Sequence, residues 1–327
     1  MSTYKKIEGR IRIVFLGCGA IAGQHAKRLS RLAGVDLFFA SRDESKAHSY
    51  SVKYKGKGIF SSYTAAIQSP NIDVVFICTP PDSHLALSIA AMTAGKHVIC
   101  EKPAFFHAAD FDIIDQLRQE KGVQLFIAEN YFYKPALRKL REVLAANIIG
   151  DIKFLFINAT KTQHVDNWRL DTETAGGGAL FEGGIHWINY ISNLGLTLQS
   201  VTGFQPSKNS SPERSMQVVA TYAEGAVGTL LYSWEVNTLF KGLRISRIFG
   251  TKGSILFESN GLYIFVRGEK WKVLFPGIAD ISGAKGMLTD FMHALRTGED
   301  AAFNLPMARR DLEFVEQAYH TSNIHTK

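Results

Sequence analysis

The fold of this chain is decided by its first apolar run and the turn after it, Ile11-Arg12-Ile13-Val14-Phe15-Leu16-Gly17-Cys18-Gly19-Ala20-Ile21-Ala22. The run is one buried strand long, and the turn has the Gly-x-Gly-x-x-Ala spacing of a dinucleotide fingerprint. Gly17 permits the tight turn, Gly19 leaves room for a pyrophosphate beside the backbone, and the small Ala22 lets helix and strand pack closely. We therefore expect phosphate groups at the positive end of the following helix.

The segment up to Glu129 alternates short apolar runs with helical patterns. This alternation predicts a parallel sheet wound by crossover helices. The run 74–78 is continuously apolar, as in a central strand that is covered on both faces. The sequence thus predicts a doubly wound α/β (Rossmann) dinucleotide-binding domain over 1–129.

The pattern changes after Glu129, where strand-like runs follow one another without helices between them. They are 216–222, 227–236, 243–249, 254–257, 262–266 and 271–275. Consecutive strands of this kind predict an α+β domain over 130–327 with a large, mostly antiparallel sheet.

Composition narrows the class of protein. A length of 327 residues suits two domains, and the formal charge of +7 favours anionic partners. Lys and Arg are scattered, so we expect no nucleic-acid partner, and no apolar run approaches membrane-spanning length. The polar first ten residues and three widely spaced cysteines predict a cytoplasmic protein without a metal site or a disulfide framework.

The exit of the second predicted strand bears on the choice of dinucleotide. An NAD site usually has an acid there, whereas this chain reads Ser41-Arg42-Asp43. The Arg42 guanidinium is able to make a bidentate contact with a ribose 2′-phosphate, and Ser41 is able to add a hydrogen bond. This pair of residues favours NADP over NAD. The alternative is that Arg42 is a solvated surface residue and Asp43 only caps the next helix.

Two further strand exits carry the motifs Thr79-Pro80-Pro81, with His84 downstream, and Glu101-Lys102-Pro103. Together with Asn130-Tyr131 and with Trp168-Arg169 before a glycine triplet, they make the chain resemble the glucose-fructose oxidoreductase / inositol dehydrogenase / MocA family. The resemblance runs from Ile11 to about Asn189, and the later strand series suits that family's open-faced substrate-binding and oligomerisation domain.

The resemblance implies a set of residues around the dinucleotide. They are Gly17, Gly19, Ala20, Ile21, Ser41, Arg42, Thr79, Pro80, His84, Glu101, Lys102 and Asn130. Lys102 would lie where nicotinamide meets substrate, and an amine near that cationic ring loses its proton more readily. An isolated Lys would otherwise be read as a surface ion-pair residue.

One predicted helix carries Glu182, His186 and Asn189, whose spacings place them along one face. Family dehydrogenases usually have Asp, His and Asp there, with the His as the base that takes the substrate's hydroxyl proton. Glu182 keeps the charge with one more methylene, whereas Asn189 removes a charge, so we expect a working base with a shifted pH optimum. The alternative for His186 is a satisfied core histidine.

The polar loop that precedes the glycine triplet contains candidates for substrate contact, and Asn189 is a further one. The loop residues are Lys161, His164, Trp168 and Arg169. The alternative is a set of solvated loop residues.

The resemblance implies a reversible hydride transfer between NADP, or NAD, and a secondary carbinol carbon of a sugar, cyclitol or related polyol. Lys102 and His186, contributed by separate lobes, would share the hydroxyl proton, with Glu182 orienting one of them. It also implies a homodimer or homotetramer through the C-terminal sheet. Two alternatives remain open: a dinucleotide-binding regulator without catalysis, and an oxidation-assisted glycosidase that keeps its NAD through a full cycle.

Overall fold

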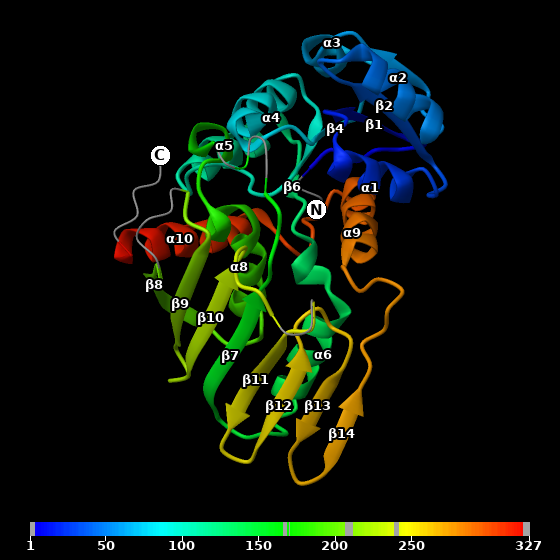
Figure 1. Ribbon diagram of the computed structural model, residues 1–327. Helices are drawn as coiled ribbons and strands as arrows, with labels where there is room; N and C mark the ends of the chain where they lie inside the picture. The colour runs from blue at the N-terminus through cyan, green and yellow to red at the C-terminus, as the bar shows by residue number, and fades with distance from the viewer. Residues whose placement is uncertain (1–3, 166–168, 170, 207–211, 239–241, 323–327) are drawn as a thin grey trace. The chain divides into compact units, whose positions relative to one another are not determined.

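The computed structural model describes residues 4–165, 169, 171–206, 212–238 and 242–322. The chain divides into two compact units (Figure 1). The first takes Met1–Ala128 with Met287–Arg309, and the second takes Glu129–Gly286 with Arg310–Lys327. The sequence suggested one boundary after Glu129, whereas the first unit also includes a segment from the C-terminal part of the chain.

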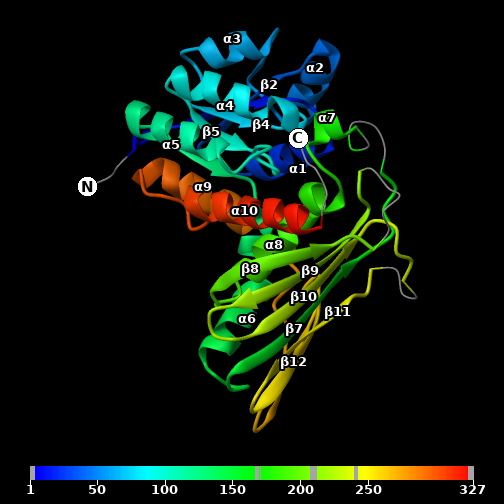
Figure 2. The same cartoon turned by 90° about the vertical axis from the view of Figure 1, so that its left-hand side faces the viewer.

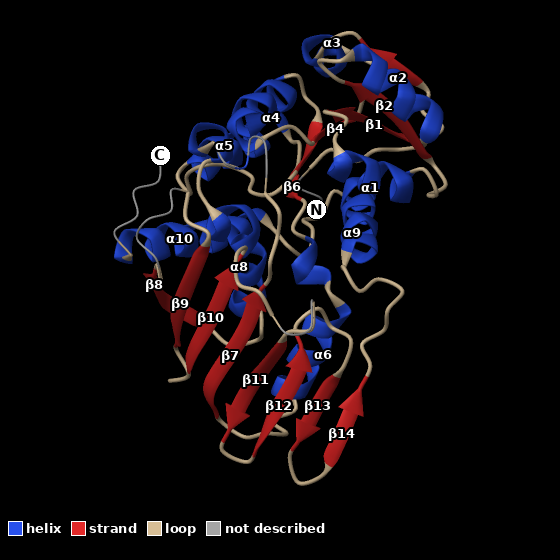
Figure 3. Cartoon of the chain, in the orientation of Figure 1, coloured by secondary structure: helices blue, strands red, loops and turns tan. Residues whose placement is uncertain are grey.

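The first unit is built on a six-stranded parallel sheet with the order β3-β2-β1-β4-β5-β6. Figure 3 draws the strands in red and labels β1, β2, β4 and β6 of this sheet. Its strands are β1 (Ile11–Leu16), β2 (Val35–Ala40), β3 (Gly58–Phe60), β4 (Val74–Ile77), β5 (His97–Cys100) and β6 (Leu125–Ile127). All four residues of β4 are buried, which confirms a central strand. The order reverses between β1 and β4, and doubly wound sheets bind ligands at the carboxyl ends of strands at such a point.

The helices of this sheet begin and end at recognisable residues. They are α1 (Ala20–Leu29), α2 (Glu44–Lys53), α3 (Tyr63–Gln68), the short 3₁₀ turn η1 (Pro81–Ser83), α4 (His84–Thr93) and α5 (Asp110–Lys121). Asp43 caps α2 by accepting the Ser45 N–H, and Ser62 caps α3 by accepting the Ala65 N–H. Gly122 ends α5 at φ 62°, a left-handed position that favours glycine.

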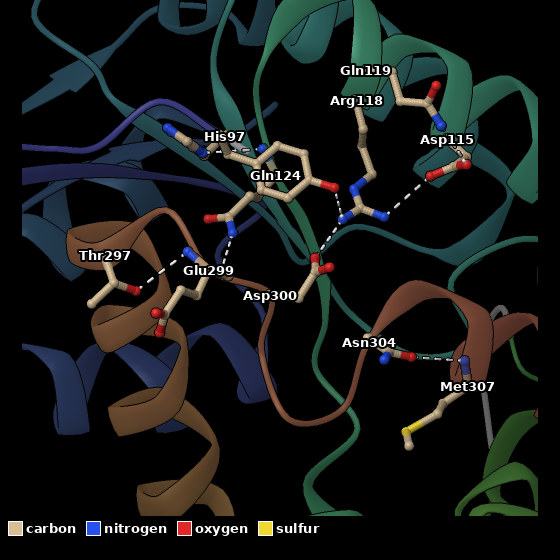
Figure 4. Close-up of polar contacts among 11 residues, drawn as sticks. His97, Asp115, Arg118, Gln119, Gln124, Thr297, Glu299, Asp300, Asn304 and Met307 are labelled. Carbon is tan, nitrogen blue, oxygen red and sulfur yellow. Dashed lines mark hydrogen bonds and ion pairs between the residues drawn. The ribbon is translucent and has the colours of Figure 1, made fainter. Parts of the chain in front are cut away.

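The segment 287–309 is held to the first unit by apolar and polar contacts, some of which Figure 4 draws. Phe126 of β6 stacks on Phe291 with 4.9 Å between ring centroids. Arg118 of α5 donates to Asp300 at 2.5 Å, and the Gln124 amide donates to the Glu299 carbonyl. These long-range contacts explain why the segment belongs with the parallel sheet.

The second unit is built on an eight-stranded sheet with the order β14-β13-β12-β11-β7-β10-β9-β8. Its strands are β7 (Ile152–Thr160), β8 (Leu198–Phe204), β9 (Ser215–Tyr222), β10 (Val227–Ser233), β11 (Ile245–Gly250), β12 (Gly253–Glu258), β13 (Ile264–Arg267) and β14 (Trp271–Leu274). Within the described residues, neighbouring strands are antiparallel except β7 with β10. The predicted fold class is therefore confirmed.

The helical elements of the C-terminal half are η2 (Asn130–Tyr133), α6 (Pro135–Ala145), α7 (Thr172–Ala175), a π-helical turn η4 (Leu180–Gly184), α8 (Ile185–Ser192), α9 (Ala284–Thr297) and α10 (Leu305–Thr321). In the second unit, α6, α8 and the later part of α10 cover one face of the sheet (Figure 2). Tyr190 of α8 stacks on Phe257 of β12, and Gln317 of α10 accepts the Val201 N–H at 3.1 Å.

No helix among the described residues has both the length and the apolar character that a membrane crossing requires.

Candidate active site

The glycine turn between β1 and α1 has the geometry that a dinucleotide requires. Gly17 has φ +96°, and a Cβ added there would lie 2.9 Å from the Cys78 carbonyl oxygen. Gly19 is exposed, and a Cβ added to it would meet nothing within 4 Å. The turn is therefore closed on the side of β4 and open above Gly19, which is the side where a pyrophosphate would approach.

The start of α1 also suits an anion. Gly19 is the N-cap residue in an extended conformation, and no side chain caps the helix or places an acid in its first turn. Ala20 and Ile21 are exposed in that first turn. Tyr50 of α2 donates to the Gly19 carbonyl at 3.0 Å, which fixes the turn from outside. The residues present thus fit a dinucleotide whose phosphates meet the N–H groups of α1.

The exit of β2 presents an exposed Arg42 beside Ser41. Asp43 uses its carboxylate to accept both the N–H and the hydroxyl of Ser45, at 3.1 and 2.5 Å. The hydrogen bond from Ser45 is the largest cause that lowers the pKa of Asp43 below its ordinary value. Asp43 is therefore engaged as a helix cap, and the nearest acid after β2 has a structural partner.

His84 ties together the loops that leave β4 and β5. Its Nδ1 lies 2.9 Å from the Pro103 carbonyl, and its Nε2 lies 2.9 Å from the Thr79 carbonyl. Burial is the main cause that lowers the pKa of His84. Pro80 is the N-cap residue of the η1 turn, and the Thr79 hydroxyl lies 2.6 Å from that of Ser83. The two loops expected to face the dinucleotide are thus held by one buried imidazole.

Glu101 and Lys102 follow β5 directly. Glu101 is buried, and its Oε2 accepts the Lys102 backbone N–H at 3.2 Å. Lys102 is half-buried. The backbone of Lys102, at the carboxyl end of β5, is therefore held by the carboxylate of Glu101.

In the second unit, the helix predicted to carry Glu182, His186 and Asn189 consists of the π turn η4 followed by α8. Short π segments are frequently found at functional sites. Gly183 lies against the Tyr232 ring, where a Cβ would clash with the hydroxyl. Small residues thus let this helix start lie directly on β10.

His186 is the second residue of α8, and its side chain has a carboxylate partner. Both Glu129 oxygens lie within reach of His186 Nδ1, at 2.7 and 2.8 Å, and Glu129 is only 3% exposed. A buried carboxylate at Nδ1 keeps a proton on that nitrogen, so the neutral ring carries its lone pair on Nε2. This tautomer makes Nε2 the proton acceptor.

Tyr131 lies flat on the same imidazole. The two rings are 4.4 Å apart at their centroids and 10° from parallel, while the Tyr131 N–H donates to Glu129 at 2.9 Å. On the tyrosine ring, Lys134 Nζ lies 4.5 Å from the centroid and donates to the Ile281 carbonyl at 3.0 Å. Burial lowers the pKa of Lys134 to about 8 and raises that of Tyr131 to about 12.

The three residues predicted on one helical face have different partners. Glu182, in the π turn, accepts from Arg169 Nε at 3.0 Å. Asn189 is fully buried and donates to Asp311 of α10 at 2.7 Å. The wider π turn departs from the α-helical spacing on which that prediction rested.

The remaining predicted residues lie at different places in the second unit. Asn130 donates its amide to the Ser282 carbonyl at 2.5 Å. Lys161 is half-buried, and its main chain pairs with Ser233 of β10. Trp168 lies outside the described residues. His164 lines a cavity of about 190 Å³ with Gln163, Val165, Arg214, Trp234 and Glu235.

Sequence reasoning missed Glu129, Tyr131 as a ring partner, and Lys134. Tyr131 entered only as part of a family motif, and Glu129 only as the end of a domain. The signal that could have found Glu129 was its position two residues after the parallel strand β6, at the carboxyl edge where such sheets place functional groups. Its pairing with a histidine 57 residues later was not visible in local pattern.

The parallel sheet with a glycine turn at its switch point defines the first unit as a Rossmann dinucleotide-binding fold. The chain belongs to the Gfo/Idh/MocA family of oxidoreductases. Residues 11–129 match the model of the oxidoreductase family's NAD-binding Rossmann fold, and residues 137–256 match the GFO/IDH/MocA C-terminal domain.

Several known proteins are similar over much of the chain. The uncharacterized oxidoreductase YfiI of Bacillus subtilis is 30% identical over 65% of this chain and 59% of its own length, so the chain matches less than two thirds of that relative. Trans-1,2-dihydrobenzene-1,2-diol dehydrogenase of Mus musculus is 25% identical over 94% of this chain and 96% of its own. A levoglucosan dehydrogenase, solved with NADH and levoglucosan, shares the fold at TM-score 0.85 and 19% identity, over 96% of this chain and 97% of that one.

Proposed function

We propose that this protein is an NAD(P)-dependent dehydrogenase or reductase of secondary alcohols, with a sugar, cyclitol or related polyol as substrate. The observation that carries the proposal is the His186 imidazole, which Glu129 holds as an Nε2 base in a chain that also has a dinucleotide-binding turn. A histidine of this kind suits proton transfer near neutral pH.

The chain's own residues would hold the dinucleotide at the edge of the first unit. Gly17 and Gly19 admit the pyrophosphate at the start of α1, and Arg42 with Ser41 favours a ribose 2′-phosphate, hence NADP. When bound, the nicotinamide supplies the two-electron chemistry by exchanging a hydride with the substrate carbon.

Lys102 and His186 manage the proton in this proposal. When the alcohol is oxidised, the hydroxyl proton would pass to His186 Nε2 or to the Lys102 amine, and the bound nicotinamide would accept the hydride from the carbinol carbon. Reduction of the ketone runs the same transfers in reverse. We propose that both side chains act on the substrate group that reacts.

Glu182 and the loop residues would orient the substrate. Arg169 binds the Glu182 carboxylate and so fixes its direction. The cavity beside His164 adds Arg214, Trp234 and Glu235, which are a cation, an aromatic face and an acid, the groups that bind polyhydroxylated molecules. Asn189, in contrast, is proposed to brace α8 against α10 through Asp311.

The relatives support the substrate class. One is named for a vicinal diol of dihydrobenzene, and another was solved with levoglucosan, an anhydrosugar. Both compounds carry secondary hydroxyls on a six-membered ring. A cyclic compound with neighbouring secondary hydroxyls is therefore the first choice for assay.

The test combines binding with turnover. NADH and NADPH are titrated by nucleotide fluorescence, and a panel of sugars, cyclitols and cyclic diols is then screened by nicotinamide absorbance. Lys102→Met is expected to lower kcat at least 100-fold and to leave nucleotide affinity within threefold. Lys121→Met, at an exposed position of α5, is the matched control with unchanged turnover.

Two results would overturn the proposal. One is near-normal turnover of Lys102→Met. The other is tight nucleotide binding without turnover of any compound in the panel, which favours a regulatory protein.

A further inference from the structure

A second histidine–carboxylate pair lies inside the first unit, and the mechanism above does not use it. His25 of α1 places Nε2 2.6 Å from Oε1 of Glu101, the residue that follows β5. The two residues are only 4% and 6% exposed. The His25 ring also packs against Phe76 of β4, with 4.8 Å between centroids. The pair therefore joins α1 to two neighbouring strands of the parallel sheet.

The surroundings of His25 define where its proton lies. His25 Nδ1 is buried and has no hydrogen-bond partner. A proton on Nδ1 would be a buried donor without an acceptor, which is unfavourable. The proton is therefore placed on Nε2, from which it is donated to Glu101.

The other oxygen of Glu101 continues the connection. Oε2 accepts the backbone N–H of Lys102 at 3.2 Å. Glu101 thus has one oxygen on the helix and one on the peptide that carries the Lys102 side chain. A rotation of the Glu101 side chain would break both hydrogen bonds together.

We propose that His25 is a positioning residue: through Glu101 it holds the Lys102 backbone in the geometry required for turnover. The inference rests on the proposed function, because it concerns the lysine that is proposed to move the proton. The inference adds a connection between α1 and the loop after β5, the two segments that are proposed to contact the dinucleotide. His25 lies six residues after Gly19 on α1, the helix whose start is proposed to bind the phosphates. One buried contact therefore joins α1 to the loop that carries Lys102.

Two substitutions at His25 separate hydrogen bonding from packing. His25→Gln keeps an N–H that can reach Glu101, whereas His25→Leu fills similar space without a donor. On the best substrate from the panel, His25→Leu is expected to lower kcat at least tenfold with KM within threefold, and His25→Gln to stay within threefold of the native kcat. His48→Leu, on the exposed side of α2, is the control with no change. Native kcat in the leucine variant, or equal losses in both variants, would overturn the inference.

Two readouts do not depend on turnover. In protein labelled with ¹⁵N-histidine, the signal lost in His25→Gln is expected to show the neutral Nε2–H tautomer; an Nδ1–H form would contradict the inference. The second readout is the rate at which pyridoxal 5′-phosphate and borohydride label Lys102, measured by peptide mass spectrometry. It should change at least threefold in His25→Leu and by less than twofold in His25→Gln.

A further variant covers the case in which His25→Leu does not fold. Glu101→Gln must turn its NH₂ group towards either the His25 N–H or the Lys102 N–H, so one contact sets donor against donor. The labelling rate of Lys102 is expected to change at least threefold here too, and an unchanged rate refutes the role of the pair. If the native protein turns over no polyol, the proposed function fails, while the tautomer and the labelling rates still decide the role of His25.

Discussion

At the scale of single residues, Glu129 gives His186 its direction and its tautomer. Glu129→Gln keeps the size of the side chain and removes the charge that stabilises a protonated imidazole. We expect kcat to fall about 10- to 100-fold with KM little changed, and the acid limb of the kcat/KM profile to move to lower pH. Steady-state kinetics from pH 5 to 9 measure both effects.

Glu142→Gln is the control for that substitution, because Glu142 is an exposed residue of α6 that pairs with Lys139. It should behave as the native protein does. A Glu129→Gln enzyme with native kcat and an unshifted acid limb would remove Glu129 from the mechanism.

Arg42 carries the expected preference for NADP. Because Asp43 is engaged as a helix cap, Arg42 is the charged side chain at this strand exit that remains for a 2′-phosphate. Arg42→Ala should raise the Kd of NADPH about 10- to 100-fold, the value of a charge-assisted contact, and leave that of NADH within threefold. Fluorescence titration measures both constants, with the exposed Arg31→Ala as control. Equal effects on the two nucleotides would refute the assignment.

At the scale of elements, the start of the His186 helix is anchored from the C-terminal helix. Glu213 Oε1 accepts the Leu180 N–H and the Tyr319 hydroxyl, each at 2.8 Å, and the Tyr319 oxygen accepts the Phe181 N–H at 3.0 Å. Burial raises the pKa of Glu213 to about 7. The carboxyl group therefore takes up a proton in the folded state at a pH where the unfolded chain has lost it.

The sign of the resulting pH dependence follows from this difference. The contribution of Glu213 to stability is fully present below its ordinary pKa of 4.5 and is lost as pH rises towards about 7. Between these values the loss is about 2–3 kcal/mol. Glu213→Gln keeps the acceptor oxygen and does not titrate, so its free energy of unfolding should fall less over the same range. Denaturant unfolding at pH 5, 6, 7 and 8 measures the slope, and parallel slopes for both proteins would contradict this account.

Comparison of these elements with the sequence shows which of them could be predicted. The glycine turn, the apolar β4 and the cap after β2 were predictable because each depends on neighbouring residues. The π turn was not, because its residues fit an α-helical pattern equally well. Strand β8 was also missed: it has few apolar residues, and its Gly203 is required by close contact with the Ala318 carbonyl of a distant helix. The partners of His186 and Asn189 likewise depend on packing between remote segments.

At the scale of the whole molecule, one face of the eight-stranded sheet carries exposed apolar side chains. Along β7, Leu155 and Ile157 are buried, whereas Phe154 and Phe156 are 62% and 37% exposed. Phe154 pairs across the ladders with Phe249 and Val227, which are also exposed. A contiguous apolar face of this kind is typical of an interface, and we propose that it joins copies of this chain.

Phe154→Asp tests that assembly. A carboxylate at the centre of the apolar face would be desolvated on association, so the mass measured by light scattering should fall to that of a smaller species. Val52→Asp, at an exposed position of α2 in the first unit, should leave the mass unchanged. A native chain that is already monomeric, or a Phe154→Asp chain of native mass, would exclude this interface.

The segment 287–309 has a consequence for how the molecule is made. On the ribosome, residues 1–128 emerge long before Phe291 and Asp300, which complete the surface around Phe126 and Arg118. The nucleotide-binding unit therefore cannot be completed directly after its first 128 residues, as the usual N-terminal-first order would have it, but only after synthesis has passed 287–309. The same dependence means that a nascent or truncated chain ending before Met287 would expose an apolar edge, making it a substrate for chaperones and proteases.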